Sequence, residues 1–437
     1  MKYSPKSFGN FDKSRRKVNV IDLSLEKTSQ DRVAIEEFYK DEHAFMGAGL
    51  SYGPIGISQT DNGTFSLKEK IDYSTHINVE NLQVEVDARM SVGNLEKMLL
   101  QSGYTLKVVP GAENASIGGC VASDVHGKNG HIFGSFGDHI NSINILSQGN
   151  SYVEQILPSD ELFSMTVGGF GVTGLIVSVN ISIEKARGIS MEVLSTRYKS
   201  SKLFVEELVS TSTRVDDIGG WFCYNQGLFR GKIFTANWSP RIPTKNGHLP
   251  FLITIPIFWI MGVGPWRSFF ISILNKYIFL QNERGTPAKP ETVLFPLSGL
   301  SGWQMVYGGS FIERQFLVSF SDSHRVINDI CKMIDKYSVQ SLLNGIKVFK
   351  GKRSGDMSFA NEGLGFSIQY SGCNIDFDDE LTQYLVSIKS PEYIAKMQAL
   401  TTTFPIGYPM YNKWFELAKS NNVKSILFDW LYKNCKR

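Results

Sequence analysis

Apolar and polar residues alternate along the first part of the chain with two different periods. The segment LQVEVDARM shows the two-residue alternation of a half-buried strand, and SVGNLEKMLLQSG, which follows it, has Leu95, Met98 and Leu99 at helical spacing. Gly103 ends the expected helix, and YTLKVVPG, HINSINILSQ and GLIVSVNISIEKA predict further strands. This mixture of strands, helices and glycine turns predicts an α+β domain.

The pattern changes near residue 187. Aromatic, strand-like segments such as WFCYNQGLFRGKIFTANW and FIERQFLVSF follow, with the helix-like DSHRVINDICKMIDKY between later strands. The chain of 437 residues is long enough for two or three hydrophobic cores. We therefore predict an α+β protein with domains at 1–186 and 187–391 and a helical C-terminal segment at 392–437.

Charge and cysteine content narrow the classes of partner. The charged fraction is 20% and the formal net charge is +3, so no large field is available for nonspecific nucleic-acid binding. The five cysteines are scattered and never in CxxC spacing, which is typical of a reducing compartment. The first residues carry charge but lack the apolar core of a secretory signal. We expect a cytoplasmic protein that binds no nucleic acid.

The segment LPFLITIPIFWIMGVGPW, at 249–266, is uncharged over nearly the length of a membrane span. Its three prolines would interrupt a helix, and broken backbone hydrogen bonds are not tolerated in lipid. Two interpretations stay open: a buried strand and loop of the second domain, or a surface flap within 249–280 that contacts the membrane interface. The flap would insert Trp259, Trp266, Phe269 and Phe270 beside Arg267 and Lys276.

Three glycine-rich segments stand out: GAGLSYG at 47–53, GGCVASDVHGKNGHIFGSFGDHI at 118–140 and GGFGVTG at 168–174. The third satisfies G-x-G-x-x-G, but a β-branched run follows it where a Rossmann motif requires a helix. The context argues against a nicotinamide site of that type. Three glycine loops in one domain can instead bring backbone N–H groups close to a diphosphate.

Histidines in the second glycine segment offer the ligand types of a metal site. His126, His131 and His139 lie near Asp124 and Asp138 in the sequence. However, their spacing puts no pair on one helical face, and zinc needs a fixed geometry. We expect no metal, and each histidine has either a structural or a catalytic role.

A resemblance joins these segments. The run VVPGAENASIGGCVASDVHGKNGHIFGSFGDHINSINIL, with GAGLSYG before it and ELFSMTVGGFGVTGLI after it, resembles the FAD-binding domain of the vanillyl-alcohol oxidase and p-cresol methylhydroxylase superfamily. Within it, the chain is similar to the decaprenylphosphoryl-β-D-ribose 2′-oxidase family, whose members carry D-[VI]-H-G-K-N followed by G-S-F-G. VLFPLSGLSGWQMVYG and FIERQFLVSF resemble that family's substrate domain, and EYIAK with YPMYNKWF its C-terminal segment. The resemblance covers nearly the whole chain.

The resemblance implies an FAD-binding domain of the p-cresol methylhydroxylase type and a substrate domain built on an antiparallel sheet. GAGLSYG would be the pyrophosphate loop, and VGGFGVTG would close over the dinucleotide. Covalent members bond the flavin through a histidine of the first loop; this loop has Ser51 and Tyr52 instead, so FAD is expected to be non-covalent. The implied cofactor-binding residues are Gly47, Ala48, Gly49, Leu50, Ser51, Tyr52, Gly111, Gly118, Gly119, Cys120, Ser123, Gly127, Asn129, Gly134, Gly169, Gly171, Gly174 and Ile176.

The resemblance also implies catalytic residues. Lys396 in YIAK corresponds to the family's active-site lysine, and Lys128 with His126 would lie near flavin and substrate. Alcohol oxidation by a flavin needs a hydride path, a proton acceptor and positive charge near the reduced flavin, and lysines supply such charge. The alternative for Lys396 is a surface lysine in a helical segment.

The implied substrate pocket departs from the family. Lys350 in IKVFK resembles a substrate-contacting lysine, although Lys347 leaves the register open. The implied substrate-binding residues are Trp221, Gln315, Lys350, Ser367 and Gln369. Met46 and Leu50 stand in place of arginines, Leu294 of a tyrosine, Glu313 of a glutamine, Ser367 of an asparagine and Gln369 of a cysteine. One hydrogen-bond partner can change discrimination by orders of magnitude, so these changes predict an altered substrate.

The function implied by the resemblance is FAD-dependent oxidation of a secondary hydroxyl of a sugar. The expected substrate is a polyprenyl-phosphate-linked pentose such as ribose, and a separate keto-sugar reductase would complete an epimerisation in cell-surface polysaccharide synthesis. Such a protein could lie peripherally at the inner face of the membrane. The alternatives are a soluble sugar-lactone or alditol oxidase of the same superfamily and a non-catalytic flavin-binding subunit.

Overall fold

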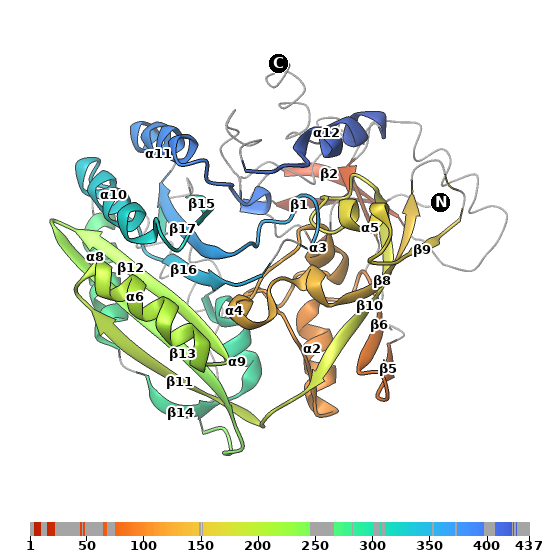
Figure 1. Ribbon diagram of the computed structural model, residues 1–437, viewed down its shortest axis with the longest axis horizontal. Coiled ribbons are helices and arrows are strands. Elements are labelled where there is room, and N and C mark those ends of the chain that lie inside the picture. Colours follow the sequence, from red (N-terminus) through yellow and green to blue (C-terminus); the bar gives the residue numbers. More distant parts are fainter. Residues whose placement is uncertain are drawn as a thin grey trace.

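The computed structural model describes residues 75–147, 150, 152–244, 266–281, 283–300, 306–307, 311–351, 354–371, 374–396, 407–421, 423 and 425 (Figure 1). Of residues 1–74 it describes residues 47–48 and four strands: β1 (Ser4–Gly9), β2 (Arg15–Ile21), β3 (Ala44–Phe45) and β4 (Thr64–Leu67). These strands form a sheet in the order β1-β2-β4-β3. The expectations for Met46, Gly49, Leu50, Ser51, Tyr52 and residues 249–265 lie outside the described residues.

A six-stranded antiparallel sheet follows, at the right of Figure 1. Its strands are β5 (His76–Asn78), β6 (Gln83–Asp87), β10 (Gly174–Lys185), β8 (Ile140–Ser147) and β9 (Glu154–Ile156) in this order, with β7 (Tyr104–Leu106) also paired to β10. The accompanying helices are α2 (Val92–Gln101), α3 (Ile117–Ala122), α4 (Gly130–Phe133), η2 (Phe136–His139) and α5 (Glu161–Thr166).

Helix α2 confirms the helical period predicted for its segment. Ser91 caps its first turn by accepting a hydrogen bond from the Asn94 N–H, and Leu95 and Leu99 are buried against the six-stranded sheet. Met98, which shares the period, is 36% exposed because it lies at the margin of the buried stripe. Gly103, just past the helix, has a positive φ of 81°, which a glycine adopts without strain.

A seven-stranded antiparallel sheet occupies the left of Figure 1. In sheet order its strands are β14 (Arg284–Ala288), β11 (Ser190–Tyr198), β13 (Leu228–Ser239), β12 (Asp217–Asn225), β16 (Asn344–Phe349), β17 (Gly363–Ser371) and β15 (Phe311–Val318). Strands β12 and β13 form a hairpin whose turn residues Gln226 and Gly227 have φ of 50° and 76°, as a type I′ turn requires.

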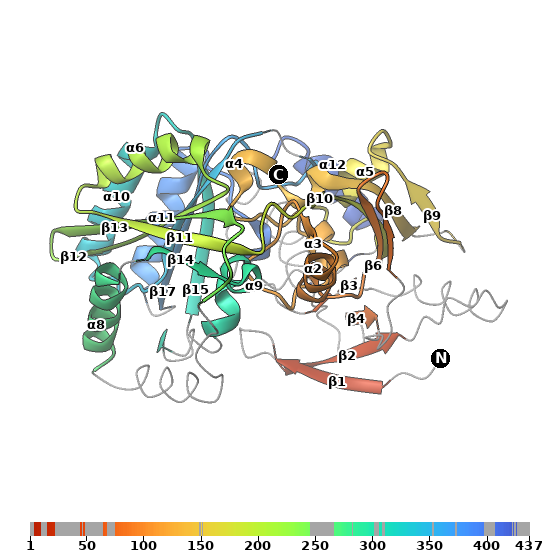
Figure 2. The same cartoon turned by 90° about the horizontal axis from the view of Figure 1, so that it is seen from below.

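Helices cover both sides of the seven-stranded sheet. On one side, α6 (Ser201–Thr211), α10 (Ser323–Lys336) and α11 (Ile375–Ser387) enclose a core with the sheet. Figure 2 shows α8 (Arg267–Leu280) on the side opposite to α6 and α10. The remaining elements are η3 (Ser212–Arg214), α9 (Pro290–Leu294), η4 (Pro296–Leu300), η6 (Ile394–Lys396) and α12 (Tyr411–Ser420).

The C-terminal helix α12 packs on the third glycine segment. Trp414 is buried with Phe170 and Val172, and its indole N–H donates to the carbonyl of Gly169 at 3.0 Å. Among the described residues, no helix combines the length and the apolar character needed to cross a bilayer. The protein is thus an α+β fold in which α12 and the residue after it contact residues 169–172.

Candidate active site

One face of the seven-stranded sheet carries a cluster of polar side chains. Neighbouring strands pair Glu313 with Gln369 and Gln315 with Ser367, and Lys347 lies on the adjoining strand β16. Successive side chains of a strand point to opposite faces, and these five residues share one face, called here the polar face. The intervening residues of the same strands face the core under α6, α10 and α11.

His126 approaches the polar face from the second glycine segment. Its Nε2 accepts a hydrogen bond from the Gln315 amide nitrogen at 2.7 Å, so its proton belongs on Nδ1. Nδ1 is buried and has no hydrogen-bond partner among the described residues. Burial first, and then the charges of Lys347 and Lys396, hold the pKa of His126 well below its usual range. His126 is therefore a neutral imidazole with a donor available to a bound group.

Three lysines surround this histidine. Lys347 Nζ donates to the carbonyl oxygen of His126 at 3.4 Å, Lys396 Nζ lies 3.5 Å from Glu313 Oε1, and Lys128 Nζ donates to the carbonyl of Val293. Burial, with the neighbouring charges of Lys396 and Lys128, lowers the pKa of Lys347 to about 7. Burial also lowers the pKa of Lys128. The site is cationic, and part of its charge changes near neutral pH.

Glu313 lies within this group of lysines, and the carboxylate of Asp217 also acts on Lys128 and Lys347. Glu313 is 5% exposed, and besides its ion pair with Lys396 it accepts hydrogen bonds from Ser367 Oγ at 2.9 Å and from Gln369 Nε2 at 3.3 Å. The sequence identified Glu313 only as a departure from the family pattern. Its spacing of two residues from Gln315 on one predicted strand is a signal that would have placed both on the same face.

The chain after α11 brings Lys396 to the sheet. Pro391 O accepts from the Leu317 N–H at 3.0 Å and the Tyr393 N–H donates to Gln315 O at 2.8 Å, so this segment runs beside β15 like an added strand. Between these bonds, Arg314 donates to both carboxylate oxygens of Glu392, at 2.6 and 2.8 Å. This buried pair holds the segment that ends in Lys396.

The two lysines of the segment IKVFK lie in different places in the structure. Lys347 lies on the polar face, whereas Lys350 follows the end of β16, where its N–H donates to the carbonyl of Gly130 and its charge acts on His131. Three residues apart on an extended chain, the two side chains point to opposite faces. The structure thus brings Lys347, and not Lys350, beside His126, while the substrate contact of either lysine stays a prediction.

Trp221 lies on the same side of the sheet but is not open to a ligand. Its ring is 5% exposed and packs with Cys223 and Phe279, and its N–H donates to Leu342 O at 2.8 Å. Trp221, implied by the resemblance as a substrate-binding residue, is thus covered by α8.

Several predicted cofactor glycines are required by the packing of the chain itself. A side chain at Gly134 would strike the Asp138 carboxylate, and one at Gly169 or Gly174 would strike a backbone carbonyl. Gly174 also has a positive φ of 143° and Gly171 one of 79°. At these positions the structure explains glycine without a ligand.

Other predicted residues border α3. Gly47 and Ala48 are exposed, and Gly47 lies so close to Ser116, the N-cap of α3, that a Cβ there would be 2.6 Å from its Oγ. Gly118 would bring a Cβ to 3.1 Å from Ala88, and Gly111 has only Leu297 at 3.5 Å. The first glycine loop thus reaches the start of α3.

The remaining predicted residues are held by the protein. Cys120 and Ile176 are in the core, and the carbonyl of Ser123 accepts from Tyr393 Oη at 2.9 Å. A Cβ at Gly127 would meet Asn129 Oδ1 at 2.7 Å. Asn129 in turn donates to the carbonyl of Lys107.

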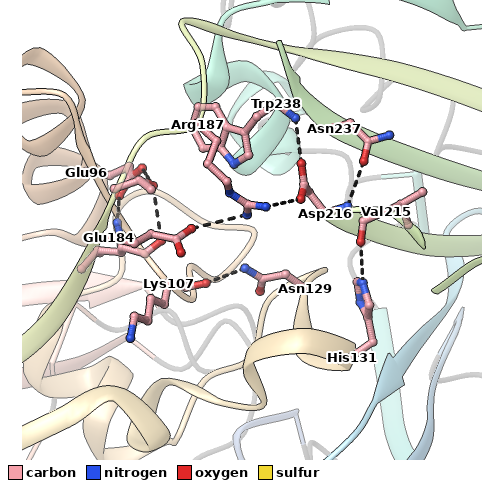
Figure 3. Close-up of polar contacts among 12 residues, drawn as sticks. Glu96, Lys107, Asn129, His131, Glu184, Arg187, Val215, Asp216, Asn237 and Trp238 are labelled. Atoms are coloured by element: carbon pink, nitrogen blue, oxygen red, sulfur yellow. Dashed lines mark hydrogen bonds and ion pairs between the residues drawn. The ribbon is translucent and has the colours of Figure 1, made fainter. Parts of the chain in front are cut away.

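Figure 3 shows where Asn129 and His131 lie, at the junction between the two large sheets. His131 Nε2 is 2.9 Å from the carbonyl of Val215, and Arg187, just after β10, pairs with Asp216 at 2.5 Å. His139 likewise contacts a carbonyl, that of Phe133, at 2.8 Å. Backbone partners therefore occupy one ring nitrogen in each of these two histidines.

Comparison with known proteins defines the class. A family model described as an FAD binding domain matches residues 26–154, which include the first glycine loop, α3 and His126. The chain thus carries an FAD binding domain, its cofactor is FAD, and the resemblance to the superfamily of FAD-linked oxidases is confirmed. It is a flavoprotein that is similar to an oxidase over most of its length.

Two relatives are more specific. The chain is 26% identical over 410 residues to the decaprenylphosphoryl-β-D-ribose oxidase of Mycolicibacterium smegmatis, covering 86% of this chain and 85% of that protein. It is also 30% identical over 95 residues, 22% of this chain and 26% of the relative, to an uncharacterized protein in the mprA 5′ region of Streptomyces coelicolor.

The described residues fit FAD. Gly47 and Ala48 are exposed beside Ser116, the N-cap of α3, and a glycine there lets a dinucleotide approach the backbone. The first N–H groups of α3 itself already donate to Met90 O, Ala88 O and Ser116 Oγ. The buried Nδ1 of His126 and Oε1 of Gln369 have no hydrogen-bond partners among the described residues, and buried polar atoms of this kind normally have one. A bound flavin and substrate would supply partners.

We expect Glu392→Ala to lower the free energy of unfolding by about 3–5 kcal/mol, because it leaves the guanidinium of Arg314 buried without its main counter-charge. Urea unfolding of the FAD-loaded protein measures this. The control is Arg325→Ala, which removes an ion pair whose two side chains are 52% and 49% exposed and should have little effect. Equal effects of the two substitutions would contradict the role given to Arg314.

Lys347→Met tests the buried ammonium. The pKa of Lys347 is about 7 in the folded protein and about 10.4 in an unfolded chain, so the unfolded state binds more protons between these values and the lysine's contribution to stability rises with pH there. The variant should therefore have a larger free energy of unfolding than the parent at pH 6. This difference should become smaller toward pH 10 by a few kcal/mol, since one pKa unit corresponds to about 1.4 kcal/mol. Urea unfolding across this range, with the exposed Lys332→Met as control, checks it; a pH-independent difference would refute it.

Proposed function

We propose that this protein is an FAD-dependent oxidoreductase that oxidises a secondary hydroxyl of a sugar, with a polyprenyl-phosphate-linked pentose such as ribose as substrate. The observation that carries the proposal is the group of three lysines and Glu313 assembled around the polar face. Cationic side chains suit a sugar phosphodiester. The printed function of the relative from Mycolicibacterium smegmatis supports the same substrate class.

We also propose a division of the chain into an FAD-binding and a substrate-binding lobe. Residues 1–186 form the FAD lobe, 187–391 the substrate lobe, and 392–437 return to the FAD lobe. The contact of Trp414 with Gly169 supports the last assignment. The exposed loop at Gly47 and Ala48, with α3, would hold the diphosphate of a non-covalently bound FAD.

In the reaction, the substrate loses a hydride from carbon and a proton from its hydroxyl. Bound FAD supplies the acceptor of the hydride. Glu313 is the proton acceptor, and its hydrogen bonds from Ser367 and Gln369 hold its oxygens toward the pocket. Lys396 and Lys128 stabilise developing negative charge, and neutral His126, oriented by Gln315, donates from Nδ1.

The keto-sugar that results retains its lipid phosphate and requires a reducing partner for an epimerisation to be completed. A separate keto-sugar reductase is therefore the class of enzyme that would consume the product. A soluble sugar-lactone or alditol oxidase would instead act on free sugars, and the first experiment below separates the two.

Anaerobic addition of polyprenylphosphoryl ribose is expected to bleach the flavin absorbance of the purified protein, because the two electrons of the alcohol pass to FAD. Acid precipitation should then release the flavin into the supernatant. If free sugars alone bleach the flavin, the substrate is a free sugar and not the lipid-linked one. If the flavin stays in the pellet, its binding is covalent and the expectation of non-covalent FAD is wrong.

Glu313→Gln and Lys396→Ala are each expected to keep FAD bound and to slow flavin reduction by at least about 100-fold, the size typical for loss of a positioned acid–base or charge-stabilising group. Stopped-flow absorbance measures the rate, and Lys332→Ala, whose lysine side chain is 76% exposed, is the control. Parental rates in either variant would remove that residue from the mechanism.

A further inference from the structure

The outer face of α8 is apolar and exposed. Its residues follow one another by three or four positions and so form a single stripe along the helix. Their exposed fractions are 65% for Trp266, at the helix N-cap, 56% for Phe269, 47% for Ile273, 59% for Tyr277 and 54% for Leu280. We call these five residues the α8 stripe.

The opposite side of α8 is firmly attached to the seven-stranded sheet. Ile271 is 1% exposed in a cluster with Phe311, and Phe279 packs on Trp221. Asn275 donates to Ser341 O at 2.9 Å, and Lys232 donates to the carbonyl of Ile278 at 3.0 Å. The stripe is therefore presented by a helix whose other side is already packed, in the position seen in Figure 2.

Charge and residue type indicate what the stripe contacts. The 14 residues of α8 contain two charged side chains, Arg267 and Lys276, both basic, and no acidic one. Tryptophan and tyrosine are the aromatic residues enriched at membrane–water interfaces. Apolar and aromatic residues beside basic ones, on a helix too short to span a bilayer, are typical of a helix that lies in the plane of an anionic membrane surface.

The inner side of α8 adjoins the candidate active site. Phe311, in the cluster under α8, is on the same face of β15 as Glu313, and residues two apart on a strand are separated by about 7 Å. Trp221, which α8 covers, lies on the same side of the sheet. The helix that carries the stripe on its outer side therefore packs, through its inner side, beside the strands of the polar face.

We propose that α8 docks this protein on an anionic lipid bilayer, with the α8 stripe in the acyl–headgroup boundary and Lys276 among the headgroups. The membrane contact rests on the α8 surface, and its purpose, delivery of a lipid-linked sugar to the polar face, rests on the proposed function. Docking through the stripe then brings the sheet that carries the polar face to the membrane surface.

Co-sedimentation of the FAD-loaded full-length protein with vesicles tests this. Phosphatidylcholine vesicles containing phosphatidylglycerol should bind the protein, pure phosphatidylcholine vesicles should bind it less, and high salt should weaken the binding. The triple variant Phe269→Ser, Ile273→Ser, Tyr277→Ser should bind at least roughly tenfold more weakly, and Lys276→Glu should weaken binding to the anionic vesicles alone.

The control is Ile375→Ser, which removes a side chain that is 66% exposed on α11 and should not affect binding. FAD absorbance and thermal unfolding of each variant establish that it is folded. The proposal is overturned if the parent binds neither kind of vesicle, or if the triple variant binds like the parent. It is also overturned if the parent binds no vesicles but sediments as a dimer in sedimentation velocity and the triple variant does not, because the stripe would then be a contact between two copies of the chain.

The substrate question is kept apart by measuring flavin bleaching with polyprenylphosphoryl ribose in detergent solution. A triple variant that is reduced like the parent in detergent but does not bind vesicles supports both proposals. If the parent binds vesicles but its flavin is not reduced, the membrane contact is supported and polyprenylphosphoryl ribose is rejected as the substrate.

Discussion

The candidate active site depends on Arg314, whose buried guanidinium makes two hydrogen bonds to Glu392 and two more to Asp378 and Thr382 of α11. Arg314 lies on β15 between Glu313 and Gln315, and the two-residue period of the strand turns its side chain away from theirs. One side of β15 therefore binds the segment that carries Lys396, while the other side presents the polar face. A buried guanidinium without its carboxylates would be costly, so this arrangement is strongly favoured.

The charges gathered at the polar face oppose stability and suit chemistry. Lys347, Lys128 and Lys396 repel one another in a buried setting, and their repulsion together with desolvation depresses the pKa of Lys347. Glu313 offsets part of this charge, and His126 stays neutral beside it. Groups whose pKa is perturbed by burial and by like charges are characteristic of functional sites, and here they are His126 and Lys128 of the second glycine segment and Lys347 of β16.

The roles of the individual site residues stay predictions, and the structure decides which of these residues meet. Gln315 and Ser367 share the polar face as a paired strand requires. The choice between Lys347 and Lys350 needed the end of β16, which the sequence does not mark. Trp221, implied by the resemblance as a substrate-binding residue, is covered by α8, an element 46 to 59 residues further along the chain.

The sequence by itself determined the local features of this protein. The helical period of α2, the type I′ turn at Gln226 and Gly227 and the glycine segments at 47–53 and 118–140, which lie within the matched FAD binding domain, are set by residues a few positions apart, because propensity and turn chemistry act at short range. Only the tertiary structure decided which charges meet. His126 and Gln315 are 189 positions apart, and burial, ion pairing and lowered pKa values exist only after such distant segments pack together.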